Sequence, residues 1–343
     1  LIIIILIGFL LRYYGSLTRS YWVDEAITVM VAKNIAETGL PFLDSGNLYL
    51  GYMLNNYITG FLIFLLGESH IISRFSSVIF GTLTIFLIYY LAKEITSKRI
   101  VGLVSAFFLS IATWEIAWST QARHYILFQF LYLLFILVLY RDYRKNGKFK
   151  FPTILKSFTI FILIMLTNGA SFFLILPSIL IFIMIYMRAG VINFIRIINK
   201  NKLYFYPFIF FLAILVVLYE WKTLVNSPSY FNLHPFILDY ISFLNKLHPI
   251  LIINFVLGIF LIKGWRKIFL FIYLLLPFIL LGFLNIYPSG IPFDRYIFFL
   301  YPIFLIPSLY SIYLSSQISR ISKTISLILF ICVFFSLPRE KEY

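Results

Sequence analysis

The sequence is poor in charged residues and contains almost no cysteine. Charged side chains make up 12% of the 343 residues, whereas a soluble globular domain carries about 25%. The single cysteine, Cys332, lies in an apolar run and excludes an intrachain disulfide or a cysteine-based metal site. The sequence also lacks a Walker loop, a dinucleotide-binding fingerprint, an HExxH helix and a strict Asp-x-Asp motif. These absences argue against nucleotide-driven chemistry and against a soluble nucleotide-sugar donor held through a metal.

Apolar residues dominate the composition. Hydrophobic residues account for 62% of the chain and aromatic residues for 20%, with a mean hydropathy of +0.97. Such a chain is a polytopic membrane protein. The formal net charge of +15 does not require a nucleic acid partner. The basic residues occupy short loops between apolar runs, as the charge bias of membrane loops predicts.

Apolar runs predict an all-α fold with about eleven transmembrane helices. These runs cover residues 1–12, 74–95, 100–117, 121–140, 151–166, 170–187, 203–221, 248–262, 267–284, 295–315 and 322–337. A further run, Leu48–Leu66, contains Asn55, Asn56 and Thr59, and we expect it to lie along the membrane surface. The chain opens at Leu1, inside an apolar run, so we expect both of its ends to be truncated.

The basic residues sort the loops onto two sides of the membrane. Loops of the cytoplasmic side carry Lys98 and Arg99, Arg141 to Lys150, Arg188 to Lys202, Lys263 to Lys267, and Arg320 and Lys323. The extracytoplasmic side receives a first loop at residues 13–73, with interfacial helices, and a second large loop at 222–248. The charged residues that fall on this outer side are Asp24, Glu25, Glu115, Arg123, Asp239, Asp294 and Arg295. We therefore expect a site built from loops at the outer face.

Two adjacent carboxylates, Asp24 and Glu25, open a predicted helix in the stretch YWVDEAITVMVAKNI, Tyr21–Ile35. An apolar stripe at helical spacing suits this helix to the membrane surface. The stripe consists of Ile27, Met30, Val31 and Ile35. Two interpretations are open. In one, Asp24 caps the helix and Glu25 complements its dipole; in the other, the pair faces a substrate carried by a lipid.

The stretch WEIAWSTQARHY, Trp114–Tyr125, places Glu115 near the outer end of one span and Arg123 near the start of the next. Charged residues in spans are costly and often functional, but an ion pair between these two explains them equally well. We interpret His124 as a polar interfacial residue. An interfacial belt explains the aromatic residues here better than sugar stacking does. These residues are Trp114, Trp118 and Tyr125.

A second arginine opens a span in FDRYIFFLYP, Phe293–Pro302. The guanidinium of Arg295 is always charged, and its planar fork of donors fits phosphate oxygens. It is therefore a candidate anchor for a lipid phosphate. A local pair with Asp294, or snorkelling toward the membrane surface, is the simpler alternative.

Four motifs in this order resemble the GT-C membrane glycosyltransferases. They are WVDEA in the first loop, GESHIISRFSSVIFGTLTIFLIYYLAKEI at Gly67–Ile95, STQARHYILF at Ser119–Phe128, and DRYIFFLYP. The most similar group contains the protein O-mannosyltransferases, the lipid A aminoarabinose transferases and the RgtA-like sugar transferases. The sequence departs from that group at Gln121, where relatives often have Glu, at Asn168, where many have His, and at Tyr49-Leu50-Gly51, which replaces Pro-Pro-Leu.

The resemblance implies a single transmembrane catalytic domain over residues 1–343. It would be an integral protein of the cell membrane that moves a sugar, with inversion, from a polyprenyl-phosphate donor to a lipid, glycan or protein acceptor at the extracytoplasmic face. The implied catalytic residues are Asp24, Glu25 and Glu115. The implied substrate-binding residues are Arg74, Arg123, Tyr125, Arg295 and Tyr296. No cofactor is required, and a divalent cation held by Asp24 and Glu115 is compatible with this interpretation.

The chemistry assigns a role to the first acid. An acceptor hydroxyl must lose its proton as it attacks the anomeric carbon, and Asp24 is our candidate for the general base. Arg123 and Arg295 would stabilise the charge on the departing phosphate. The rival functions are a lipid or solute transporter without covalent chemistry, and a membrane scaffold. A transporter tends to place ionisable groups near the bilayer midplane in repeated halves, which the sequence does not show.

The sorting of basic loops predicts an accessibility pattern. Single cysteines placed at Asn47, Asn232 and Ser289 should react with an impermeant thiol reagent from outside the cell. Cysteines placed at Asn146 and Asn199 should not react. Uniform labelling, or labelling at Asn146 alone, would overturn the assignment of the site to the outer face.

Overall fold

The computed structural model describes residues 1–146, 151–168, 177, 179–180, 240–244, 249–283 and 294–317. Most of these residues are helical, and they contain no β-strand, only an isolated bridge between Phe42 and Leu48. The α-helices are α1 (Ile2–Thr18), α2 (Val23–Thr38), α3 (Met53–Leu66), α4 (His70–Thr96), α5 (Arg99–Ile111), α6 (Thr113–Ser119), α7 (Tyr125–Asn146), α8 (Phe151–Thr167), α13 (Pro249–Leu261), α14 (Trp265–Leu270), α15 (Leu276–Phe283) and α16 (Tyr301–Ser315). A π-helical segment, η2 (Phe271–Leu275), joins α14 to α15, and two 3-10 turns, η3 (Asp294–Tyr296) and η4 (Phe298–Leu300), precede α16. The described residues thus have the expected all-α class.

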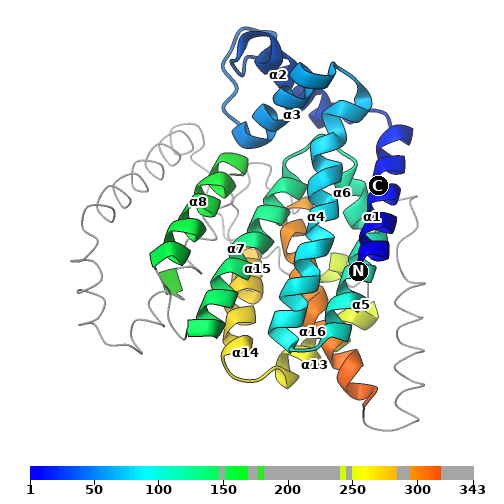
Figure 1. Ribbon diagram of the computed structural model, residues 1–343, viewed down its shortest axis with the longest axis vertical. Coiled ribbons are helices and arrows are strands. Elements are labelled where there is room, and N and C mark those ends of the chain that lie inside the picture. The colour runs from blue at the N-terminus through cyan, green and yellow to red at the C-terminus, as the bar shows by residue number, and fades with distance from the viewer. Residues whose placement is uncertain are drawn as a thin grey trace, which may run out of the picture.

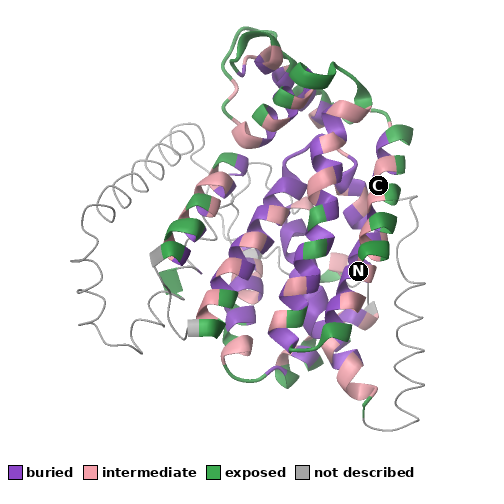
Figure 2. Cartoon of the chain, viewed as in Figure 1, coloured by how far each residue is buried: buried purple, intermediate pink, exposed green. Residues whose placement is uncertain are grey.

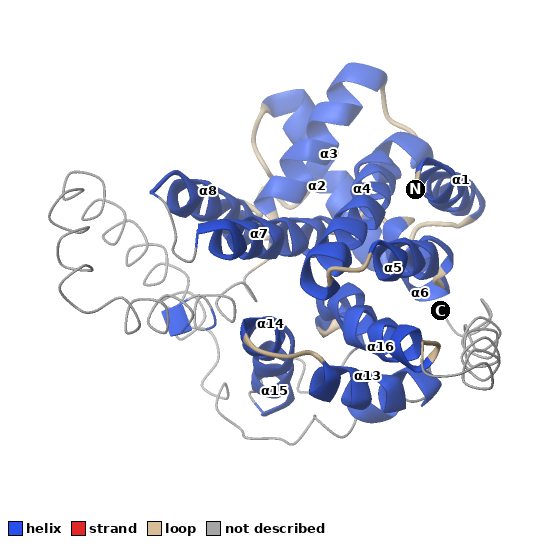
Figure 3. Cartoon of the chain, turned by 60° about the horizontal axis from the view of Figure 1, so that its bottom comes forward, coloured by secondary structure: helices blue, strands red, loops and turns tan. Residues whose placement is uncertain are grey.

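Helix α4 forms the centre of a bundle. It has 27 residues, and it packs against α1, α5, α7 and α16 (Figures 1 and 3). Small residues allow the close approach of its neighbours. A Cβ atom on Gly102 of α5 would lie 2.7 Å from the carbonyl oxygen of Tyr89, so only glycine permits this packing. Helix α13 packs along α16 on the other side of the bundle.

Helices α2 and α3 lie across one end of the bundle (Figure 1). The chain bends by 93° between α1 and α2, and α2 ends at Gly39, whose φ of 79° favours glycine. Helix α3 then packs back on α2, where a Cβ atom on Gly60 would lie 2.8 Å from the carbonyl oxygen of Ala32. Val31 and Ile35, expected on the membrane surface, are buried inside the protein, while Ile27 is exposed. The apolar stripe is therefore partly a packing surface.

The run 100–117, expected as one span, is broken. Helices α5 and α6 meet at an angle of 61°, because Ala112 between them has extended dihedral angles, φ −61° and ψ 118°. The break turns α6 into the bundle. Trp114 is consequently 1% exposed, and its ring packs edge-on against Phe298 and Tyr301 at centroid distances of 5.3 and 5.2 Å.

Burial follows this arrangement. The facing sides of α4, α7 and α16 form a continuous buried core, whereas the outer side of α1 is exposed (Figure 2). The interfacial belt expected at Trp114 is wrong, since this side chain belongs to the core. Trp118 is half-buried and packs against the ring of Tyr125 at 4.8 Å.

The expected number of about eleven membrane spans is not confirmed. Among the described residues, three helical stretches are long and apolar enough to cross a membrane: His70–Thr96, Tyr125–Lys145 and Phe298–Ser315. The number rises to five if each bent pair, α1 with α2 and α5 with α6, counts as one span. The expected spans 203–221 and 322–337, most of 170–187 and most of the outer loop 222–248 lie outside the described residues.

Candidate functional site

The start of α2 places the two adjacent acids in different environments. Trp22 is the residue that caps α2, so the interpretation of Asp24 as the N-cap is wrong. The side chain of Glu25 reaches back and accepts a hydrogen bond from the backbone N–H of Trp22 at 3.0 Å. Glu25 is 1% exposed, whereas the side chain of Asp24 is 36% exposed.

Glu25 forms a fully buried ion pair with Arg74 of α4. Nε and Nη2 of Arg74 donate to the two carboxylate oxygens at 2.9 and 3.0 Å. The remaining guanidinium N–H groups donate to the backbone carbonyls of Ser16, Arg19 and Ser20. Arg74 therefore has no N–H left for a substrate, and we interpret it as the anchor of the break between α1 and α2.

Glu25 also reaches the turn between α6 and α7. Its Oε1 accepts a hydrogen bond from the backbone N–H of Ala122 at 2.8 Å. Ala122 directly precedes Arg123, as Asp24 directly precedes Glu25. One buried carboxylate thus aligns the two segments that carry Asp24 and Arg123.

Asp24 lies between two arginines. Its Oδ2 is 3.3 Å from Nη2 of Arg123 and 3.4 Å from Nη1 of Arg295, and its backbone oxygen accepts from Nη1 of Arg123 at 2.9 Å. The local ion pair between Glu115 and Arg123, one of the sequence interpretations, does not form, because Arg123 pairs with Asp24 instead. Arg295 likewise reaches Asp24, 271 residues away in the sequence. Three distant segments of the chain therefore meet at one carboxylate oxygen.

A tyrosine and a histidine that sequence analysis did not assign to the site lie beside Arg123. The ring of Tyr52 stacks on His124 with 3.6 Å between centroids and 8° between planes. His124 is 2% exposed, so its side chain is buried inside the protein. Burial, then the charges of Arg123 and Arg295, lower the pKa of His124 well below its ordinary value. Tyr52 has a positive φ of 54° at the start of α3, and no motif in the sequence singled it out.

Aromatic rings surround the two guanidiniums. The guanidinium of Arg123 lies 5.3 Å from the ring centroid of Tyr52 and 5.7 Å from that of Tyr125. The guanidinium of Arg295 lies 5.5 Å from the ring of Tyr296. Cations at these distances interact favourably with the ring faces. Tyr125 and Tyr296, both expected to bind the substrate, thus lie beside the arginines.

Glu115 lies in a separate buried network. Its Oε1 accepts a hydrogen bond from Nε2 of Gln129 at 2.7 Å, and it interacts electrostatically with Arg12 of α1. Arg12 is fully buried and donates to Ser119 and to backbone carbonyls of α1 and α5. Among the described residues, no hydrogen bond or ion pair joins Glu115 to the arginines at Asp24.

No protein-family model and no curated protein sequence gives a significant match. Solved structures do match. The archaeal oligosaccharyltransferase AglB from Archaeoglobus fulgidus, in complex with an inhibitory peptide and a dolichol-phosphate, has a TM-score of 0.67 at 13% identity, covering 98% of this chain and 54% of that chain. ArnT from Cupriavidus metallidurans in the apo state has a TM-score of 0.66 at 10% identity, covering 95% and 61%. Both are GT-C membrane glycosyltransferases. The chain has the GT-C fold.

The GT-C fold expected from four sequence motifs is therefore confirmed. ArnT bound to undecaprenyl phosphate also matches, with a TM-score of 0.62 at 11% identity, covering 97% of this chain and 63% of that one. The chain thus spans about half to two thirds of the length of these proteins. At such low identity, the likeness establishes the arrangement of the helices.

The described residues do not fit a metal ion shared by Asp24 and Glu115. Another Archaeoglobus fulgidus oligosaccharyltransferase structure with the GT-C fold is a complex with Zn and sulfate. In the part of this chain that the structure describes, no group of three or more His, Cys, Asp or Glu side chains is placed to hold a metal. Oδ2 of Asp24 faces Arg123 and Arg295, whose charges oppose a cation, and Glu115 contacts Gln129. We therefore derive no catalytic step through a metal.

The two acids should differ sharply in their effect on stability. Glu25→Gln leaves the buried Arg74 guanidinium without its charge partner, and breaking such a pair costs about 3–5 kcal/mol. Asp24→Asn changes a partly exposed side chain and should cost about 0.5 kcal/mol or less. The thermal unfolding midpoint of each purified variant in detergent measures the difference. Equal midpoints for the two variants would contradict the structural role of Glu25.

Proposed function

We propose that the protein is a glycosyltransferase that moves a sugar from a polyprenyl-phosphate donor to a lipid, glycan or protein acceptor at the extracytoplasmic face. The observation that carries this proposal is the convergence of Arg123 and Arg295 on Oδ2 of Asp24. Both guanidiniums carry planar forks of N–H donors, a geometry that binds phosphate oxygens. With one carboxylate against two guanidiniums, the site is also positively charged, which favours an anionic phosphate.

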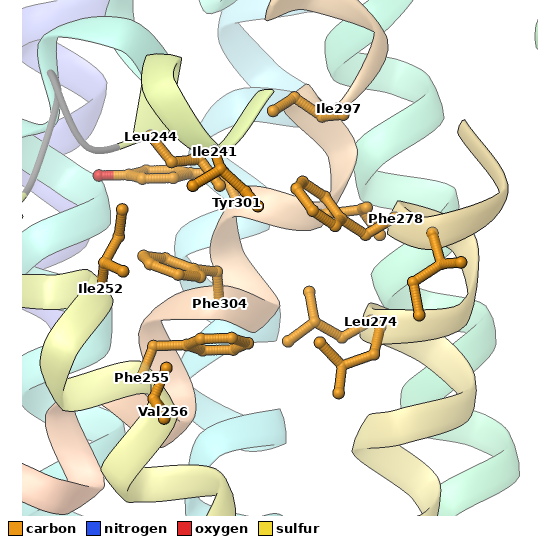
Figure 4. Close-up of a pocket in the computed structure, with 13 residues that line it drawn as sticks. Ile241, Leu244, Ile252, Phe255, Val256, Leu274, Phe278, Ile297, Tyr301 and Phe304 are labelled. Atoms are coloured by element: carbon orange, nitrogen blue, oxygen red, sulfur yellow. The ribbon is translucent and has the colours of Figure 1, made fainter. Parts of the chain in front are cut away.

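An apolar cavity, here called the groove, is lined in part by the segment that follows Arg295. A cavity of about 400 Å³ lies between α13, α15 and α16 and is lined almost wholly by apolar side chains (Figure 4). Ile297, two residues after Arg295, lines this groove. A phosphate bound by Arg295 would place the hydrocarbon chain of the donor close to the groove.

The transfer then follows in one displacement. The acceptor hydroxyl oxygen attacks the anomeric carbon, the bond from that carbon to the phosphate oxygen breaks, and its electron pair leaves with the polyprenyl phosphate. Arg123 and Arg295 stabilise the charge that develops on the phosphate. When the phosphate takes over these guanidiniums, Oδ2 of Asp24 is released to accept the acceptor's proton. A single displacement inverts the configuration of the sugar.

A carrier of lipid phosphates without covalent chemistry is the alternative function. The same arginine pair and the same groove would bind a polyprenyl phosphate whether or not a sugar is transferred. The two functions differ in their product. A transferase moves the label of a polyprenyl-phosphate-linked sugar to an acceptor, whereas a carrier leaves that label on the lipid.

The phosphate role of Arg295 predicts that charge alone will not suffice. Arg295→Lys keeps the positive charge but loses the planar fork, so it should weaken binding of a polyprenyl phosphate by about tenfold. Arg295→Ala should weaken binding further. Equilibrium binding to the purified protein in detergent measures both effects. Unchanged affinity in both variants would leave the pair with Asp24 as a purely structural contact.

The base role of Asp24 predicts a variant that binds but does not react. Asp24→Asn cannot take the acceptor's proton, and a general base contributes about a hundred- to ten-thousand-fold in rate. Incubation of purified protein with radiolabelled polyprenyl-phosphate sugars and membrane extract should show transfer by the wild type. Transfer by Asp24→Asn should be at least about a hundred times slower, with donor binding retained. A wild-type protein that moves no label from any of these donors would favour the carrier function.

A further inference from the structure

A buried glutamine joins the segments that carry the two arginines. Gln129 lies on α7 and is fully buried. Its Nε2 donates to Oε1 of Glu115 at 2.7 Å and to the backbone carbonyl of Phe298 at 3.0 Å. This one amide group therefore connects α6, α7 and the 3-10 turn η4.

The first of these bonds closes the turn that presents Arg123. Glu115 precedes residues 120–124 on α6, and Gln129 follows them on α7. The hydrogen bond between these two side chains joins the helices on either side of the turn. Arg123 lies two residues before α7 begins. The hydrogen bond from the N–H of Ala122 to Glu25 also constrains this turn.

The second bond holds the segment that presents Arg295. Phe298 follows Arg295 by three residues, and its carbonyl also accepts the N–H of Tyr301 within the same segment. The bond from Gln129 therefore ties this backbone to a different helix. The ring of Phe298 adds a contact of 5.3 Å with Trp114 on α6. Because η3 is a single 3-10 turn, its own hydrogen bonds give Arg295 little support.

We propose that Gln129 is a positioning residue that sets the separation of Arg123 and Arg295. This inference rests on the proposed function, in which both guanidiniums bind the donor phosphate. Two guanidiniums grip one phosphate only when their spacing matches its oxygens, and a displacement of about 1 Å weakens such a site strongly. Gln129 acts through its two hydrogen-bond partners, the side chain of Glu115 and the carbonyl of Phe298, which belong to the segments that carry the arginines.

A purely structural role for Gln129 predicts only a loss of stability, as for any other buried hydrogen bond of α7. A buried amide needs partners in any case, and losing a buried hydrogen bond lowers stability wherever it occurs. Tyr132→Phe supplies the matched control. Tyr132 is also fully buried on α7, and its hydroxyl donates to the carbonyl of Tyr273 at 2.5 Å, in η2 and not in the segments that carry the arginines.

The first test is binding of undecaprenyl phosphate to the purified full chain in detergent. Gln129→Met keeps the length of the side chain and removes both hydrogen bonds, so it should weaken binding by about tenfold. Tyr132→Phe should change binding by less than about twofold. Equal losses in the two variants, or no loss in Gln129→Met, would overturn the proposal.

The second test asks whether the effect passes through Arg295. In an Arg295→Ala background, Gln129→Met should weaken binding by less than about twofold, because the guanidinium that it positions is already absent. A tenfold effect in both backgrounds would show that Gln129 acts elsewhere, and would overturn the proposal.

The third test needs no ligand and separates this inference from the proposed function. Hydrogen–deuterium exchange of the peptides that cover residues 119–124 and 294–300 should be faster in Gln129→Met than in Tyr132→Phe. Unchanged exchange in Gln129→Met would overturn the positioning role, whatever the result of the lipid-binding test. A wild-type protein that binds no undecaprenyl phosphate would contradict the proposed function, and the exchange result would still decide the role of Gln129.

Discussion

The buried ion pair between Glu25 and Arg74 is the interaction on which the candidate site depends. Removing both charges from water is costly, and the cost is offset only when every polar atom finds a partner. Here both do: the carboxylate accepts hydrogen bonds from Arg74, Trp22 and Ala122, and the guanidinium also donates to three backbone carbonyls. These contacts hold α4, the bend between α1 and α2, and the turn before α7 in one arrangement.

The placement of the reactive groups follows from this pair. Asp24 directly precedes Glu25, and Arg123 directly follows Ala122, whose N–H group donates to Glu25, so this one carboxylate brings both residues together. Arg295 arrives from the opposite end of the chain, and its segment is supported by the aromatic packing of Phe298 and by Gln129. The result is a carboxylate at the surface with two guanidiniums beside it and fully enclosed charges beneath it. The charged groups available to a substrate, around Asp24, are therefore distinct from Glu25 and Arg74, which stabilise the fold.

The aromatic residues serve two purposes at this end of the bundle. Trp114 is buried next to α16. Its ring packs edge-on against Phe298 and Tyr301, in the segment that follows Arg295. Tyr52, Tyr125 and Tyr296 instead face the guanidiniums. Cations near the faces of aromatic rings are stabilised by them. These rings therefore help to hold the two positive charges next to Asp24.

The sequence alone indicated the membrane class and the helical fold, and it predicted that the charged site residues share one face. Hydropathy and loop charge are properties of short segments, so they identify helices and place Asp24, Arg123 and Arg295 on one face before any contact is known. The four ordered motifs were sufficient to indicate the GT-C fold at sequence identities of 10–13% to its solved members.

Only the tertiary structure decided which charge meets which. Arg123 is 99 residues from Asp24, and Arg295 is 271 residues from it, so no local pattern separates these partners from the nearer Glu115 and Asp294. For the same reason, adjacent acids that look alike in sequence have opposite surroundings, and Arg74 is enclosed where a substrate contact was expected. Burial and pairing depend on how distant helices pack, and spacing along the chain does not record that packing.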